Sequence, residues 1–344
     1  MIRRRSLLGG CALLSSVWAG LSGTAAQGGE PGEQAADQKG DEKGAGPVYL
    51  LVGVPAGSVN DRIARDFAQC FGRHLGAEVD PVSRPGNGGY TMLTGLADAP
   101  PPKEATTGAI GWVMTPTLAA RAIDRGDPSL LDRIRLVGQV EREPIAFVTQ
   151  ADKPADSVQD IIRRASDDAD AVPLATPLPG SPAHLTALRL QGLAQTRLNI
   201  VTFPSPAAAR QALVAGNVSA AALNLSEVIG SIQDGTLSAL GITAHRRLGL
   251  LPDTPVLDEA GIPLRAFVHR GIGVPAGTPQ PVIDRLATTL QAVAADEAFQ
   301  RQAEQSGCYV AWADGAAWTR RMQAEAAMLR DLWRTDPWLA SSGG

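Results

Sequence analysis

Short apolar runs alternate with helix-like segments along most of this 344-residue chain. Residues 48–54 (VYLLVGV) form a continuous apolar run typical of a buried strand, and residues 59–75 follow with the spacing of an amphipathic helix. The same order returns in expected strands at 78–82 and 109–113, with a helical stretch at 90–96 between them. Because this alternation favours parallel pairing with helices on both faces, the sequence predicts an α/β fold with mostly parallel sheets covered by helices.

The alternation continues through the second half of the chain. Further strands are expected at 145–149, 198–203, 220–223 and 237–243, and further helices at 158–165, 184–193, 206–215, 281–294 and 316–334. These units are too many for one ordinary sheet, and no turn-rich linker separates two consecutive halves. We therefore expect two lobes between which the chain crosses and returns, with a ligand bound between them.

The first 26 residues have the order of a secretory signal peptide. Three arginines at positions 3–5 precede an apolar stretch at 7–21 and a run of small residues. This pattern predicts export, with cleavage after Ala25 or Ala26.

The type of export signal stays open between two alternatives. The R-R-S-L-L segment at 4–8 resembles a twin-arginine signal, and an ordinary Sec signal with one extra arginine fits equally well. A lipid anchor is not expected, because only two apolar residues precede the lipobox-like spelling at 8–11. Residues 27–46 are rich in charge and glycine and lack large apolar residues, which predicts a flexible tether.

The composition is that of an ordinary globular protein, with 44% hydrophobic and 19% charged residues. The net charge of −4 becomes −7 beyond residue 26, with 28 basic against 35 acidic residues, so no nucleic-acid partner is expected. Cys70 and Cys308 remain after export; they could form a disulfide or stay as two buried thiols. With no C-x-x-C motif and no His/Cys grouping in sequence, no metal site and no cofactor are expected.

A small-residue turn, Pro55-Ala56-Gly57-Ser58, joins the first expected strand to its helix, with Ser58 or Asn60 as the cap. Free backbone N–H groups and the positive end of the helix dipole at such a turn suit a carboxylate. A simply capped helix without a ligand has the same sequence pattern.

Two further glycine-containing turns follow. The segment at 83–90 (SRPGNGGY) lacks the G-x-G-x-x-G spacing, and no GxxxxGK[ST] motif occurs, which excludes a phosphate-binding loop. The turn at 179–185 (PGSPAHL) leads into another helix, where Ser181 and backbone N–H groups could meet an anion from the opposite lobe. We expect His184 to make a local hydrogen bond there.

Five segments in this order resemble the Bug, or TctC, family, the extracytoplasmic solute-binding proteins of tripartite tricarboxylate transporters. They are PAGSVNDRIAR from position 55, RPGNGGYTMLTGLADAPP from 84, GSPAHL from 180, ALGITAHRRLGLLPDTPVLDEAGIP from 239 and GIGVPAGTPQPVIDRL from 271. The resemblance spans residues 48–333. It implies a two-lobed, periplasmic-binding-protein-like fold with a hinge, closing on a small carboxylate without catalysis. Lobe 1 would hold residues 47–145 plus 241–344, including both cysteines, and lobe 2 residues 146–240.

The resemblance also implies where the ligand binds. The expected residues are Ala56, Gly57, Ser58, Val59, Asn60, Asp61, Thr115, Gly180, Ser181, Ala183, His184 and Ser205. In the family, backbone amides, hydroxyls and ordered waters hold one carboxylate of the ligand. Asp61 matches an acidic residue of the family, although a favourable charge in the first helical turn also explains it.

The chain departs from the family pattern near the expected cleft. Ser58 stands where a second glycine is usual, Asn60 replaces Ser or Thr, and Leu188 replaces an acidic residue. Residues 203–205 and 216–219 also differ from the usual motifs, so the identity of the ligand is not transferred.

Three functions follow as alternatives. The first is a periplasmic, monomeric binding protein whose partners are a small organic anion and membrane transporter subunits. The second is a receptor that presents its liganded form to a signalling partner. The third is a hydrolase, which is disfavoured because His74, His184, His245 and His269 are isolated in sequence and no G-x-S-x-G motif occurs.

Overall fold

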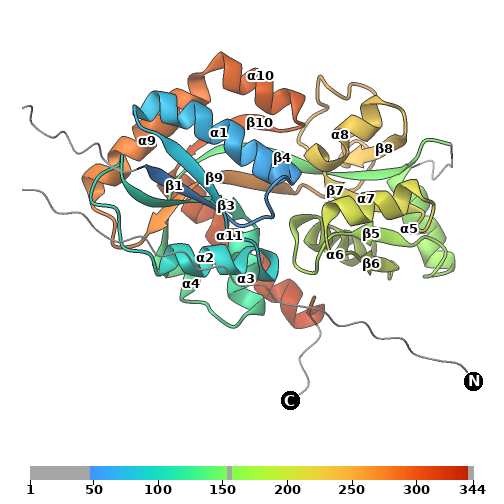
Figure 1. Cartoon of the computed structure of the whole chain (residues 1–344). Coiled ribbons are helices and arrows are strands. Elements are labelled where there is room, and N and C mark those ends of the chain that lie inside the picture. The colour runs from blue at the N-terminus through green and yellow to red at the C-terminus, as the bar shows by residue number, and fades with distance from the viewer. Residues whose placement is uncertain (1–46, 153–156, 340–344) are drawn as a thin grey trace, which may run out of the picture. The chain divides into compact units, whose positions relative to one another are not determined.

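The computed structural model describes residues 47–152 and 157–339, which contain one mixed, ten-stranded sheet covered by helices (Figure 1). The strands are β1 (Val48–Val52), β2 (Val79–Ser83), β3 (Gly108–Thr115), β4 (Ile134–Gln150), β5 (Leu174–Thr176), β6 (Ile200–Thr202), β7 (Ala220–Asn224), β8 (Leu237–Ile242), β9 (Phe267–Pro275) and β10 (Tyr309–Asp314). The predicted signal peptide (1–26) and tether (27–46) lie outside the described residues.

The helices alternate with strands along much of the chain, as the sequence predicts. They are α1 (Val59–Leu75), α2 (Tyr90–Ala97), α3 (Thr117–Asp124), α4 (Leu130–Arg133), α5 (Val158–Asp167), α6 (Pro182–Ala194), α7 (Pro206–Val214), α8 (Leu225–Gln233), α9 (Gln280–Ala295), α10 (Glu297–Gln305) and α11 (Gly315–Thr335), with a 3-10 turn η1 (Asn87–Gly89) before α2. The alternation has exceptions, since β8 is followed directly by β9, and α3–α4 and α9–α10 are consecutive helices. No helix within residues 47–152 and 157–339 is both long and apolar enough to cross a membrane.

The long strand β4 connects two regions of the sheet, which we call the first and second lobes. Its first part, residues 134–144, pairs with β9 and in part with β10, next to the parallel set β2-β1-β3. Its last part, residues 145–150, pairs with β7 and β8, next to the parallel strands β5 and β6. One continuous strand therefore belongs to both lobes (Figure 1).

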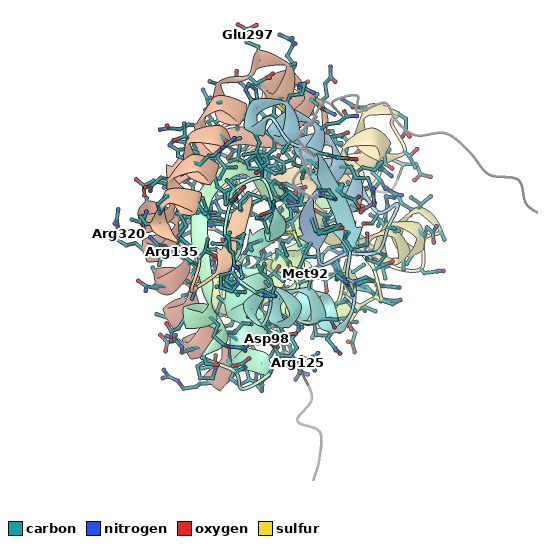
Figure 2. The ribbon with its side chains drawn as sticks, turned by 60° about the vertical axis from the view of Figure 1, so that its left-hand side comes forward. Met92, Asp98, Arg125, Arg135, Glu297 and Arg320 are labelled. Atoms are coloured by element: carbon teal, nitrogen blue, oxygen red, sulfur yellow. The ribbon has the colours of Figure 1, made fainter. Side chains whose placement is uncertain are left out.

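Each lobe has helices on both faces of its strands. In the first lobe, α1, α9 and α10 pack on one face, and α2, α3, α4 and α11 pack on the other. In the second lobe, α5 and α6 cover one face, and α7 and α8 cover the other. Met92 of α2 lies inside the first lobe, whereas Arg320 of α11 and Glu297 of α10 lie at the edge of the molecule (Figure 2).

A separate apolar cluster joins the lobes. Ala119 and Ala120 of α3 and Leu329 of α11 pack there against Leu185 and Leu188 of α6. Leu188, which stands where the family resemblance expects an acidic residue, is therefore part of a hydrophobic contact between the lobes.

The α/β fold with two lobes is confirmed, and α1 has the bounds that the sequence predicts. The expectation of mostly parallel sheets is wrong for the central strands. Among the described strands, four pairings are parallel and five are antiparallel. All five antiparallel pairings involve β4 or β9. These two strands run in opposite directions at the centre of the sheet, where the chain passes from one lobe to the other.

The two cysteines are free buried thiols in one hydrophobic cluster of the first lobe, which confirms that they share a lobe. The predicted lobe boundaries remain a prediction. The connection from 243 to 266 contributes Leu257, Ile262 and Leu264 to a cluster of the second lobe.

Phe67 provides a test of the first-lobe core. Its ring is fully buried on α1 and stacks on Trp112 and Phe71, with centroids 4.3 and 5.2 Å away. We expect Phe67→Ala to lower the free energy of unfolding by about 3–5 kcal/mol, because it leaves a cavity and removes the ring contacts. Urea unfolding would measure this. The control Leu193→Ala, at a side chain 50% exposed, should change stability by less than about 1 kcal/mol.

Candidate functional site

Two turns of the same construction open α1 in the first lobe and α6 in the second. Each has a glycine with positive φ, Gly57 at 78° and Gly180 at 72°, followed directly by a serine that caps the helix. These are the two turns at which the sequence predicts the ligand.

In the first turn, the Ser58 hydroxyl accepts a hydrogen bond from the Asp61 N–H at 3.2 Å. The Asp61 carboxylate in turn accepts from the Gly57 N–H at 2.8 Å. It also accepts from Arg65 at 2.9 Å and from the Ser83 hydroxyl at 3.0 Å. Burial raises the pKa of Asp61, but the bonds from Arg65, Gly57 and Ser83 outweigh it, and the pKa is lowered below its usual value. Asp61 therefore holds the turn as an ionised carboxylate.

In the second turn, the Ser181 hydroxyl accepts from the His184 N–H at 3.3 Å. The His184 ring accepts through Nδ1 from the Gly180 N–H, also at 3.3 Å. Burial, and then the charge of Arg121, lower the pKa of His184 to about 4. A neutral imidazole is needed to accept this bond, so the local hydrogen bond expected for His184 is confirmed.

The remaining predicted residues are placed differently. Ala56 is exposed in the first turn, Val59 is half-buried in the first turn of α1, and Ala183 is fully buried in the second-lobe core. The buried Thr115 hydroxyl accepts from the Trp318 indole N–H at 3.1 Å. Ser205 caps α7 by accepting from Ala208 N–H at 3.1 Å. Thr115 and Ala183 are thus packed in the interior in this state of the protein.

Arg121 of α3 connects the second turn to the first lobe. Its buried guanidinium donates to the Pro179 carbonyl at 3.1 Å and to the Asn87 carbonyl at 3.5 Å, and it pairs with Asp124 at 2.6 Å. A Cβ at Gly180 would collide with this guanidinium and with the Trp338 ring. Position 180 therefore requires glycine both for its φ and for its space.

Asn60 connects the first turn to the second lobe. Its side-chain NH2 donates to Glu227 of α8 at 3.0 Å, and its carbonyl oxygen accepts from Arg270 of β9 at 2.6 Å. Arg270 is 0% exposed and also donates to Glu141 and Glu143 of β4. Serine or threonine at position 60 has neither the reach nor the separate donor and acceptor of this amide.

The carboxyl groups of this network have raised pKa values. Burial is the largest cause at Glu227, the negative charge of Glu143 adds to it, and the pKa rises to about 7 despite Arg210 and Arg270. Burial likewise raises the pKa of Glu141 to about 7, against the attraction of Arg270. The charge of the network therefore changes near neutral pH.

Two cavities lie near these residues. One of about 450 Å³ lies between α1 and the second lobe; Val59 and Arg62 line it on one side, and Arg210 and Glu227 on the other. A larger one of about 670 Å³ lies between α6 and residues 336–338, and His184 is the one predicted ligand residue that lines it. The first cavity has the position expected for a site between lobes, and its volume suits a small ligand.

The two buried histidines do not form an acid–base arrangement. His184 is engaged with Gly180, and burial with the charges of Arg321, Arg142 and Arg270 lowers the pKa of His269 to about 3. A histidine base in a hydrolase needs a carboxylate that orients its ring and a nucleophile beside it. The charged groups that lower the pKa values of His184 and His269 are instead arginines.

Comparison with known proteins identifies the family. A model of the tripartite tricarboxylate transporter family receptor, TctC, matches residues 63–332. The chain belongs to this receptor family. The resemblance to Bug proteins is thereby confirmed, and this family consists of periplasmic solute-binding receptors.

Individual relatives agree with this assignment. Protein BugT of Bordetella pertussis is 27% identical over 287 residues, which cover 78% of this chain and 83% of BugT. The structure of the periplasmic binding protein BugD has a TM-score of 0.73 at 25% identity, covering 84% of this chain and 97% of BugD. MatC from Rhodopseudomonas palustris with bound malate has a TM-score of 0.70 at 22% identity, covering 83% of this chain and 98% of MatC.

Sequence reasoning named none of Arg121, Arg270, Glu141, Glu143 and Glu227. One signal was present: Glu141 and Glu143 directly precede the apolar run 144–148, and Arg270 lies between apolar residues at 267–268 and at 272. A charge inside a strand that is buried on both faces requires a partner of opposite sign. The partners themselves come from distant segments and could not be named.

The pH dependence of stability tests the charge of the network. The folded state raises the pKa of Glu227 to about 7 from 4.5, so it favours the neutral carboxyl. As pH rises from about 4.5 to 7, the unfolded chain ionises this group first, and its contribution to stability falls by about 3 kcal/mol. Glu227→Gln removes this titration and keeps an acceptor for Asn60.

Urea unfolding of both proteins between pH 4 and 8 measures the effect. The stability of Glu227→Gln relative to the unmodified protein should rise with pH over this interval and level off above it. The control Glu259→Gln, at an exposed residue, should give a nearly constant difference. A constant difference for Glu227→Gln as well would show that its carboxyl is not perturbed by folding.

Proposed function

We propose that this receptor captures a small organic carboxylate between its lobes in the periplasm and delivers it to membrane subunits of a tripartite transporter. The observation that carries the proposal is the pair of matching turns, Gly57-Ser58 and Gly180-Ser181, which open a helix in each lobe. In this proposal the two helix N-termini and the two serine hydroxyls face one shared site. One anion could therefore bind to both lobes and favour the closed form.

The Ser58 and Ser181 hydroxyls can serve a ligand in the state described. Each oxygen accepts one bond from its own helix, and each O–H proton remains available to donate to a carboxylate oxygen. The N–H groups of Val59 and Asn60, in the first turn of α1, have no carbonyl of a preceding helical turn to bind. The side chains of Ala183 and Thr115 are buried within their own lobes, so we propose no direct ligand contact for them.

A dicarboxylate of about four to six carbons is the proposed ligand class. The malate in MatC supports it, and so do the flanking arginines 62 and 210, which line the cavity between α1 and the second lobe. We further propose that the receptor acts as a monomer without catalysis and is exported by a Sec or twin-arginine signal. The lobes would be residues 47–145 plus 241–344 and residues 146–240.

A thermal-shift screen with organic acids, each paired with its neutral amide, would identify the ligand class. A ligand that binds only the folded protein raises the melting temperature by mass action. A shift with dicarboxylates and none with the amides supports the proposal. If no acid gives a shift, even with protein refolded to release any ligand retained during purification, the proposal is wrong.

Serine substitutions then locate the site. Ser58→Ala and Ser181→Ala should each weaken dicarboxylate binding about 5-fold, the equivalent of one hydrogen bond of about 1 kcal/mol, measured by calorimetry. Each also removes a helix cap and lowers stability by about 1 kcal/mol. Ser157→Ala removes the same kind of cap from α5 and is the matched control, because it should lower stability without changing affinity. Equal affinity in all three variants would place the ligand elsewhere.

A further inference from the structure

Cys70, His74 and Asp296 form a compact polar cluster in the first lobe, apart from the two turns. The Asp296 Oδ2 atom lies 3.0 Å from His74 Nε2 and 3.5 Å from Cys70 Sγ. All three potential ligand atoms lie within 4.8 Å of one another. The sequence predicts no metal site, since Cys70 and His74 show no metal-binding motif and Asp296 is 222 residues from His74 in the chain.

The fold fixes each of the three side chains independently. Cys70 and His74 are four residues apart on α1 and therefore lie on the same helix face. Asp296 caps α10, and its Oδ1 atom accepts from the N–H groups of Ala298 and Phe299. This leaves Oδ2 directed toward α1, which lies beside α9 and α10 in the same hydrophobic cluster (Figure 1).

We propose that Cys70, His74 and Asp296 bind one divalent transition-metal ion, with Zn²⁺ as the best match. Thiolate, imidazole and carboxylate together are a ligand set of zinc, and three protein ligands leave a fourth position for water. Zinc bonds of about 2.3 Å to sulfur and about 2.0 Å to nitrogen and oxygen place tetrahedral ligands roughly 3.3–3.5 Å apart. The two distances to Asp296 Oδ2, 3.0 and 3.5 Å, differ from these values by only a few tenths of an ångström, and the separation of the Cys70 and His74 ligand atoms is within 4.8 Å.

The charges in the cluster favour a metal over a reactive cysteine. The Asp296 carboxylate lies 3.5 Å from the Cys70 sulfur, so a thiolate there would meet a like charge unless a cation lies between them. A bound cation would replace the thiol proton, which passes to the solvent as the metal–sulfur bond forms. The same cation would relieve the repulsion between thiolate and carboxylate.

The site is accessible from one side. The His74 side chain is 32% exposed, and Glu297, the neighbour of Asp296, lies at the edge of the molecule (Figure 2). Arg73 lies 3.9 Å from Asp296 Oδ2, but its side chain is 60% exposed and can turn toward solvent. A bound metal would link the last turns of α1 to the junction of α9 and α10. Its role would be to stabilise the first lobe.

Metal titration of the full protein tests the proposal. The protein is purified without a polyhistidine tag, treated with chelator to remove bound metal, and kept under reducing conditions. We expect one equivalent of Zn²⁺ to bind and raise the melting temperature. Co²⁺ should give the absorption of a cobalt–thiolate bond. Cys70→Ser should abolish that absorption. His74→Ala, at an exposed residue, should weaken Zn²⁺ binding by at least roughly 100-fold.

Two further variants separate metal ligation from helix capping. Asp296→Asn keeps an oxygen that can cap α10 but weakens the metal ligand, so it should reduce Zn²⁺ affinity. Asp314→Asn changes the corresponding cap of α11, where Asp314 accepts from Ala317 N–H, and should leave Zn²⁺ binding unchanged. Absence of Zn²⁺ binding to the unmodified protein, or unchanged binding in both His74→Ala and Cys70→Ser, would overturn the proposal.

Discussion

The arrangement of the two lobes depends on the buried guanidinium of Arg270. It lies on β9 and contacts Glu141 and Glu143 of β4 together with Asn60 of α1. Glu143 also accepts from the Ser226 N–H at 2.6 Å, at the start of α8 in the second lobe. Removing one member of such a network leaves an unpaired buried charge, which typically costs about 3–5 kcal/mol. Arg270 therefore links β9, β4 and α1 directly, and it links α8 of the second lobe through Glu143.

This network lies beside the first turn, so under the proposed function it would relate stability to ligand binding. The backbone of Asn60 lies in the first turn of α1, and its side-chain amide bonds to Glu227 and Arg270 of the network. A movement that separates the lobes must break the bond between Asn60 and Glu227 or carry both residues along. Because Glu227 and Glu141 have pKa values near 7, the cost of this separation depends on pH in the neutral range.

The two turns use side chains in place of a ligand to satisfy their backbone. Asp61 and His184 occupy equivalent positions, four residues after the glycine, and each accepts from that glycine's N–H. One side chain is anionic and the other is neutral, so the turns differ in charge although their backbones match. An anionic ligand would therefore meet less repulsion at the second turn than at the first.

The sequence by itself determined the α/β class, the bounds of α1, the two turns and the family resemblance. These features depend on local patterns, namely apolar periodicity, helix caps and glycines with positive φ, which each segment carries within itself. The first part of β4 and all of β9 were missed, since charged residues and glycines interrupt their apolar pattern. Only the tertiary structure decided the antiparallel centre of the sheet, the partners of Arg270 and the meeting of Cys70 and His74 with Asp296. These contacts join distant segments of the chain, 129 positions apart for Arg270 and Glu141 and 226 for Cys70 and Asp296, and they form only when the helices and strands pack.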